Sequence, residues 1–267
     1  MTAGPLVLTT LQYALGALSG GLVGFTLGLV GGGGSILAVP LMVYLVGVSN
    51  PHVAIGTSAL AVAANAGANL VPHARRHMIK WRCAGMYAAA GVLGALGGST
   101  IGKAFDGQKL LALFAILMIM VGVLMLRSRG NPGDADVQCH RENAPKVIGY
   151  GAATGLFSGF FGIGGGFLIV PGLMASTGMP IAYAVGSSLV AVAAFGLTTS
   201  LNYAWSGLVD WPLAAAFIGG GIFGGLIGAW ASRALAARKG LLNAVFATLI
   251  FVVATYMLWK SWNAIQL

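Results

Sequence analysis

Charged residues are scarce in this chain. Only 7% of its 267 residues are Asp, Glu, Lys or Arg, whereas 58% are hydrophobic. This composition cannot cover the surface of a water-soluble domain, so a soluble globular protein is excluded. The alternating pattern of a transmembrane β-barrel is also missing, because the apolar runs are continuous and rich in Ala, Leu, Val and Gly. The composition therefore predicts an all-α polytopic membrane protein.

Acidic residues are the rarest charged group, and none lies inside an apolar run. The set is Asp106, Asp134, Asp136, Glu142 and Asp210. Carriers coupled to sodium or protons commonly place a carboxylate within a span, so cation transport is disfavoured. An enzyme would lack a carboxylate to pair with Ser or His in the membrane. No His, Cys or acidic cluster has metal-ligand spacing either, so we expect no catalytic residues, no metal site and no cofactor.

Cysteine is equally rare. Cys83 begins an apolar run, and Cys139 lies in the only long polar stretch of the chain. Both are expected on the cytoplasmic side, where thiols stay reduced. No structural disulfide is therefore expected.

Apolar runs of membrane-spanning length are abundant, since about 20 helical residues cross about 30 Å of hydrocarbon. The first half of the chain contains the runs 6–30, 36–48, 53–71, 83–101 and 110–126, and the second half contains 147–163, 167–177, 181–203, 211–230 and 241–259. The second run of each half is too short to cross comfortably.

A duplicated motif relates the two halves. The segment 28–40, GLVGGGGSILAVP, recurs at 159–171 as GFFGIGGGFLIVP, with seven of thirteen positions identical. The repeat predicts transmembrane repeat 1 over residues 1–127 and repeat 2 over 147–267, joined by a cytoplasmic linker at 128–146. Many secondary transporters are built from two such halves, with substrate bound near mid-membrane between them.

Basic residues indicate that the repeats have inverted topology. The connection 73–82 contains Arg75, Arg76, Lys80 and Arg82, whereas its counterpart 204–211 contains no Lys or Arg. Because basic loops stay in the cytoplasm, these two connections are expected on opposite sides. Both termini then lie on the outer side of a multi-pass protein of the cell inner membrane. The net charge of +9 is explained by orientation and anionic lipid, so no nucleic-acid partner is expected.

Each glycine run stands between one helical run and the short second run. Glycine permits positive φ and sharp turns, and the helix that follows, at Ser35 or Phe167, would present free N–H groups to an anion. We therefore expect broken or re-entrant helices that bind substrate with neutral groups. A packing hinge without a ligand remains the alternative.

The third run of each half adds hydroxyl and amide groups. Thr57, Ser58, Ser187 and Ser188 begin equivalent helices and are expected to meet the glycine breaks at one junction. Such residues also often bond a neighbouring helix or their own backbone, and that reading stays open. The candidate substrate-binding residues are Gly31, Gly32, Gly33, Gly34, Ser35, Thr57, Ser58, Asn65, Asn69, Gly162, Gly164, Gly165, Gly166, Ser187, Ser188, Thr198 and Asn202.

Other glycines and the tryptophans are assigned to the scaffold. Glycines recur every four residues at 94, 98 and 102 and again at 220, 224 and 228, which predicts close helix packing. Trp81, Trp211, Trp259 and Trp262 are expected to anchor at the membrane interface.

With these motifs the chain resembles the sulfite exporter TauE/SafE family of membrane permeases. The resemblance rests on the glycine runs ending in Pro40 and Pro171 and on the elements GTS at 56–58 and GSS at 186–188, and it covers nearly the whole chain. It implies export of small sulfur-containing or organic anions such as sulfite, thiosulfate, sulfonates or sulfoacetate. The expected partners are this small anion and the lipid bilayer. The alternatives are a receptor-like membrane protein, an intramembrane enzyme, or a permease for a non-sulfur carboxylate.

Overall fold

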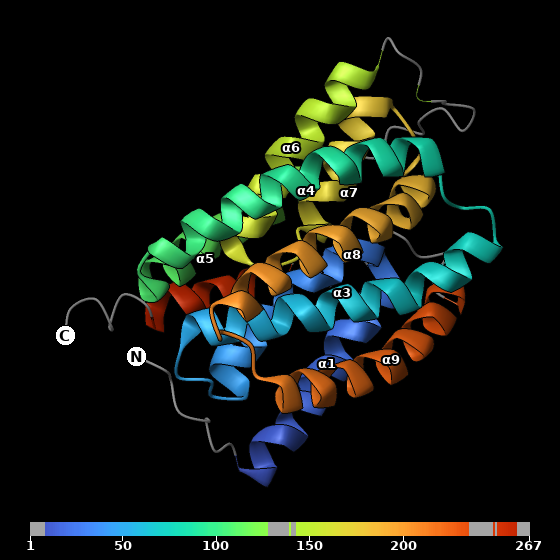
Figure 1. Ribbon diagram of the computed structural model, residues 1–267. Helices are drawn as coiled ribbons and strands as arrows, with labels where there is room; N and C mark the ends of the chain where they lie inside the picture. The colour runs from blue at the N-terminus through green and yellow to red at the C-terminus, as the bar shows by residue number, and fades with distance from the viewer. Residues whose placement is uncertain (1–8, 128–138, 140–142, 235–247, 249, 261–267) are drawn as a thin grey trace.

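The computed structural model describes residues 9–127, 139, 143–234, 248 and 250–260, and this part of the chain is helical without strands (Figure 1). Repeat 1 contains helix α1 (Thr10–Val30), the 3₁₀ helix η1 (Gly31–Leu37), α2 (Ala38–Pro40), the π turn η2 (Leu41–Leu45), α3 (Pro51–Arg75), α4 (Trp81–Ala104) and α5 (Gly107–Arg127). Repeat 2 contains α6 (Ala144–Phe161), α7 (Gly166–Thr177), α8 (Ile181–Trp205), α9 (Trp211–Ala234) and a last helix, Ile250–Lys260.

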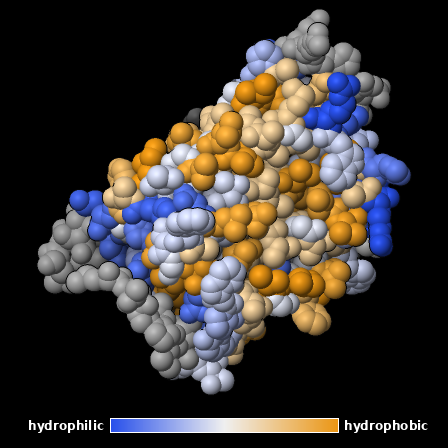
Figure 2. Space-filling model, viewed as in Figure 1, coloured by the Kyte–Doolittle hydropathy of each residue, from blue (hydrophilic) through white to orange (hydrophobic). Residues whose placement is uncertain are grey.

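Helix length and hydropathy confirm the prediction of an all-helical polytopic membrane protein. Within the described residues, α3, α4, α8 and α9 as far as Ala231 are long and apolar enough to cross a bilayer. Large side chains such as Leu93 and Phe223 are 74% and 73% exposed, as suits contact with lipid. Figure 2 shows hydrophobic residues across the middle of the visible face and hydrophilic residues gathered toward its left and right margins.

The second helical run is short in both repeats, as predicted. Gly34–Leu45 and Gly166–Thr177 are the corresponding segments, and α7 has 12 residues, a length of about 18 Å at 1.5 Å per residue. This is well below the thickness of the hydrocarbon core. The last predicted run, 241–259, is described at 248 and 250–259, where it is helical, and Trp262 lies outside the described residues. Trp81, Trp211 and Trp259 are 56%, 61% and 64% exposed, which suits interfacial anchors.

The glycine triplets pack the first helix of one repeat against the fourth helix of the other. A Cβ added at Gly94, Gly98 or Gly102 of α4 would overlap the α6 backbone at Ala152, Leu156 and Phe160. In the same way, a Cβ at Gly220, Gly224 or Gly228 of α9 would overlap the α1 backbone at Ala17, Gly21 and Phe25. The predicted close-packing faces are therefore confirmed.

Helices α3 and α8 lie side by side at the centre of the molecule and run antiparallel (Figure 1). Gly56, at the start of α3, lies against Tyr203 at the end of α8 and Leu208 just beyond it. Gly186, at the start of α8, lies against Met78, just beyond the end of α3. Each helix therefore begins where its counterpart ends.

The start of α1 and the end of the last helix lie beside the same segment. Gln12 donates from Nε2 to the carbonyl of Val46 at 3.2 Å. Lys260 places Nζ 5.2 Å from the centre of the Tyr44 ring. The chain thus enters the first helix and leaves the last described helix at the same end of the molecule.

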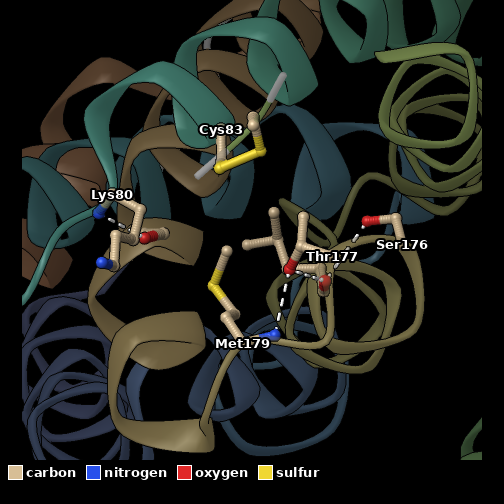
Figure 3. The surroundings of a disulfide bond; sticks show 8 residues. Lys80, Cys83, Ser176, Thr177 and Met179 are labelled. Atoms are coloured by element: carbon tan, nitrogen blue, oxygen red, sulfur yellow. Dashed lines mark hydrogen bonds between the residues drawn. A yellow bond between two sulfur atoms is a disulfide. The ribbon is translucent and has the colours of Figure 1, made fainter. Parts of the chain in front are cut away.

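The expectation that no disulfide forms is wrong, because Cys83 and Cys139 are bonded, with their Cα atoms 5.4 Å apart. Figure 3 shows the bond near the end of α7, where the Thr177 hydroxyl accepts the Met179 N–H at 3.2 Å. Both cysteines are buried, at 1% and 2% exposure. The sequence placed Cys139 only within a polar stretch, and nothing in that stretch indicates that it returns to the start of α4.

Replacing Gly224 with Val should strongly destabilise the protein. The added side chain would collide with the Gly21 carbonyl, and helices packed backbone to backbone cannot yield without separating. We expect a loss of about 2 kcal/mol or more, typical of severe overpacking. Thermal unfolding of the detergent-purified protein measures this loss.

Gly219→Val is the matched control on the same helix, because nothing lies within 4 Å of its Cβ position. This variant should unfold near the wild-type temperature. Equal destabilisation by both variants would contradict the assignment of α9 to tight packing through Gly224.

Candidate functional site

The second glycine run makes the open turn that its sequence predicts. Gly162 ends α6 with φ of 68°, and Gly164 and Gly165 follow with φ of 65° and 66°. Other residues rarely adopt such angles, so glycine is required here. Gly165 is the N-cap of α7, which begins at Gly166, one residue before the predicted Phe167.

This turn lies at the crossing of the two central helices. A Cβ at Gly164 would stand 2.9 Å from Val62 Cγ1 of α3 and 3.4 Å from Val192 Cγ1 of α8. Val62 and Val192 occupy equivalent positions in the two repeats, and both are fully buried. The turn therefore reaches the centre of the molecule, where the two halves meet.

Ser158 is a polar group at this turn that sequence reasoning missed. A Cβ at Gly165 would lie 2.7 Å from Ser158 Oγ. The hydroxyl is fully buried and has no hydrogen-bond partner within the described residues. A single Ser among the small and aromatic residues of α6 carries no sequence signal that separates it from a packing residue.

The first glycine run differs from the prediction. Gly31, Gly32, Gly33, Gly34 and Ser35 all lie in the 3₁₀ helix η1, and the following α-helix begins only at Ala38. A 3₁₀ helix pairs its N–H groups with carbonyls three residues back, so this run offers fewer free donors than an open turn. The predicted helix start at Ser35 is therefore wrong. η1 packs against α7 and α8, which makes the two glycine elements neighbours.

Thr57 and Ser187 fasten loops of the opposite repeat. The Thr57 hydroxyl accepts the N–H of Asp210, just before α9, at 2.9 Å. The Ser187 hydroxyl accepts the N–H of Lys80, just before α4, at 3.0 Å. These equivalent bonds satisfy backbone donors at the starts of α9 and α4.

The predicted junction of these hydroxyls with the glycine breaks is wrong. Because α3 and α8 run antiparallel, Thr57 and Ser187 lie at opposite ends of the helix pair. Ser58 and Ser188, the adjacent candidates, donate to Ile55 and Val185 of their own helices at 3.1 and 2.8 Å.

Thr198 and Asn202 also have partners of their own. Thr198 donates to the carbonyl of Ala194, one turn back in α8, at 2.8 Å. Asn202 donates from Nδ2 to Ser99 Oγ at 2.6 Å. Its Oδ1 accepts from Lys103 Nζ at 2.9 Å. These bonds join the ends of α4 and α8, so Asn202 acts there as an interhelical contact.

Asn65 and Asn69 share the face of α3 that meets α9. Asn69 donates from Nδ2 to the backbone carbonyl of Asn65 at 2.9 Å. Neither side-chain amide atom of Asn65 has a partner in the described part of the chain. A Cβ at Gly221 or Gly225 of α9 would collide with these two amides, so the glycines provide the space that the amides occupy.

The packed apolar helices, with the α6–α7 turn inserted between α3 and α8, are those of a polytopic helical membrane protein. The chain belongs to the sulfite exporter TauE/SafE family, whose model matches residues 16–257.

Curated relatives agree with this membership. The chain is 55% identical over 253 residues to a "Probable membrane transporter protein" of Xylella fastidiosa (strain 9a5c), covering 92% of this chain and 95% of that protein. It is 29% identical over 235 residues to the "Probable membrane transporter protein YunE" of Bacillus subtilis (strain 168), covering 80% and 86%. No solved structure gives a significant match. The protein is therefore a membrane transporter.

Replacing Ser187 with Ala should lower stability by about 1 kcal/mol, because the Lys80 N–H loses its acceptor. Ser188→Ala is the control, since its hydroxyl bonds only within its own helix. Thermal unfolding separates the two variants. An unchanged unfolding temperature for Ser187→Ala, together with weaker substrate binding, would instead return Ser187 to the substrate site.

Proposed function

We propose that this transporter moves a small sulfur-containing anion, of the sulfite, thiosulfate or sulfonate class, across the cell inner membrane. The sulfur-containing class is suggested by the family to which the chain belongs. The observation that favours an anion is the turn from Gly162 to Gly166, which brings the N-terminus of α7 to the crossing of α3 and α8. Helix N-termini present N–H groups without intrahelical partners and a positive dipole end. The Ser158 hydroxyl adds a further donor beside that terminus.

The charge distribution supports an anionic substrate. The described acids, Asp106 and Asp210, lie in connections, so neither of them repels an anion at the turn. Neutral N–H and O–H donors also avoid the cost of leaving a fixed cation in hydrocarbon between transport events.

We infer that residues 1–127 and 147–267 form inverted-topology repeats, with the linker 128–146 in the cytoplasm and both termini outside. The antiparallel arrangement of α3 and α8 supports inversion, because equivalent helices then cross the membrane in opposite directions. The basic residues of the connection between α3 and α4 support the cytoplasmic assignment of that end. The Cys83–Cys139 bond lies at the same end, where cytoplasmic conditions favour its reduction.

Cysteine labelling tests the inferred topology. Trp205 is 94% exposed at the end of α8. In a Cys83→Ser, Cys139→Ser background, Trp205→Cys should react with an impermeant maleimide added to intact cells. Arg76→Cys, at the end of α3, should react only after permeabilisation. The reverse pattern would overturn the inferred orientation. It would place the end with the Cys83–Cys139 bond outside the cytoplasm, where a disulfide is stable.

Substitution at the turn tests the proposed function. Gly164→Ala adds a methyl group against Val62 and Val192 and should abolish flux of labelled sulfite, thiosulfate or sulfonate from proteoliposomes. Gly178→Ala is the matched control, because Gly178 has a similar φ of 76° but no atom within 4 Å of its Cβ position. Both variants carry the same backbone strain, so only the central one should lose transport. Normal flux by a correctly folded Gly164→Ala protein would make the glycine turn a packing hinge.

A further inference from the structure

The side-chain amide of Asn65 is a buried polar group to which the described fold gives no hydrogen-bond partner. Asn65 is fully buried near the middle of α3, and neither Nδ2 nor Oδ1 has a partner within the described residues. Nearly all buried polar side chains in folded proteins are hydrogen-bonded, and an unpaired one in a low-dielectric interior is costly. Asn69 does not pair with the Asn65 side chain, because Asn69 Nδ2 donates to the backbone carbonyl of Asn65.

The internal repeat supplies a direct comparison. The position equivalent to Asn65 in repeat 2 is Phe195, and the position equivalent to Gly221 is Gly91. A Cβ at Gly91 would overlap the Phe195 ring, just as a Cβ at Gly221 would overlap the Asn65 amide. Phe195 stacks on Tyr87, with ring centroids 6.4 Å apart. The same glycine-lined space is thus filled by an aromatic ring in one half and by an amide in the other.

An apolar residue is therefore sufficient for packing at this position of the repeat. We propose that Asn65 is a specificity-determining residue that binds an oxygen of the transported oxyanion through its Nδ2 donors, in repeat 1 only. The proposal rests on the transport function proposed above and identifies one residue that binds the transported anion. The two halves of the carrier are then unequal, with a polar contact on the α3–α9 side and an aromatic packing contact on the α8–α4 side.

The chemistry of the carboxamide fits an oxyanion. Nδ2 carries two N–H donors that oxygens of the anion can accept, and Oδ1 can accept a bond from water that enters with the anion. A cation would need several oxygen ligands, and no group of three or more His, Cys, Asp or Glu residues occurs in the described part of the chain. The neutral amide also leaves no net charge in the membrane when the substrate departs.

Asn65→Leu tests the proposal, because Leu has nearly the same shape but no polar atoms. In proteoliposomes loaded with labelled sulfite, thiosulfate or a sulfonate, the variant should raise the KM for flux by roughly tenfold or more, as expected when a hydrogen bond to a charged ligand is lost. The same substitution removes an unpaired polar group from an apolar site, so the detergent-purified variant should unfold at a higher temperature than wild type. A structural role would move the unfolding temperature in the opposite direction.

Phe195→Leu is the control at the equivalent position. It should lower the unfolding temperature, because the ring leaves a cavity, and keep the KM of wild type. An unchanged KM in Asn65→Leu, or an unfolding temperature below that of wild type, would overturn the proposal. If wild type moves none of the three anions, the proposed function fails. The unfolding temperature of Asn65→Leu then still tests the role of Asn65. A value above that of wild type means that the amide serves a ligand and not the stability of the fold.

Discussion

Backbone polar groups must be paired in hydrocarbon, and this constraint decides where the chain can break a helix. Irregular backbone survives at membrane depth only inside protein or beside water. The turn from Gly162 to Gly166 meets the condition because it lies between Val62 of α3 and Val192 of α8, away from lipid. The glycine-packed pairs α1–α9 and α4–α6 flank these central helices. The scaffold therefore holds a short irregular stretch of backbone inside the protein, at the N-terminus of α7, and this is where we propose that the anion binds.

The two halves of the chain, related by a repeated sequence motif, share some contacts and differ in others. The bonds from Thr57 to Asp210 and from Ser187 to Lys80 are equivalent and hold the loops of each repeat on the other. The glycine runs are not equivalent, since one forms a 3₁₀ helix and the other an open turn. Contacts common to both halves hold helices and loops together, and we propose that differences between the halves mark where substrate binds.

Much of the fold could be predicted from the sequence, because hydropathy and helix length determine what crosses a bilayer. All ten apolar runs correspond, in whole or in part, to described helical segments, and spacing alone identified the glycine packing faces. Less of the candidate site was predictable. The partners of Thr57 and Ser187 come from loops of the other repeat, more than 100 residues away. The Cys83–Cys139 pair likewise depends on where a polar linker folds back, which local patterns do not encode.

The central claim is that this protein moves a small anion. Because no acidic residue lies in an apolar run, where sodium-coupled carriers commonly place one, we expect the anion to move down its electrochemical gradient without a sodium partner. Reconstituted protein on a solid-supported membrane measures this directly, as the current evoked by a jump in sulfite, thiosulfate or sulfonate concentration. The account predicts a current with the sign of anion movement for at least one of these, unchanged when sodium is replaced by a bulky cation. An inside-negative potential would then favour export by about 2.3 kcal/mol per charge per 100 mV. No current from any of them, or a current that requires sodium, would contradict the account.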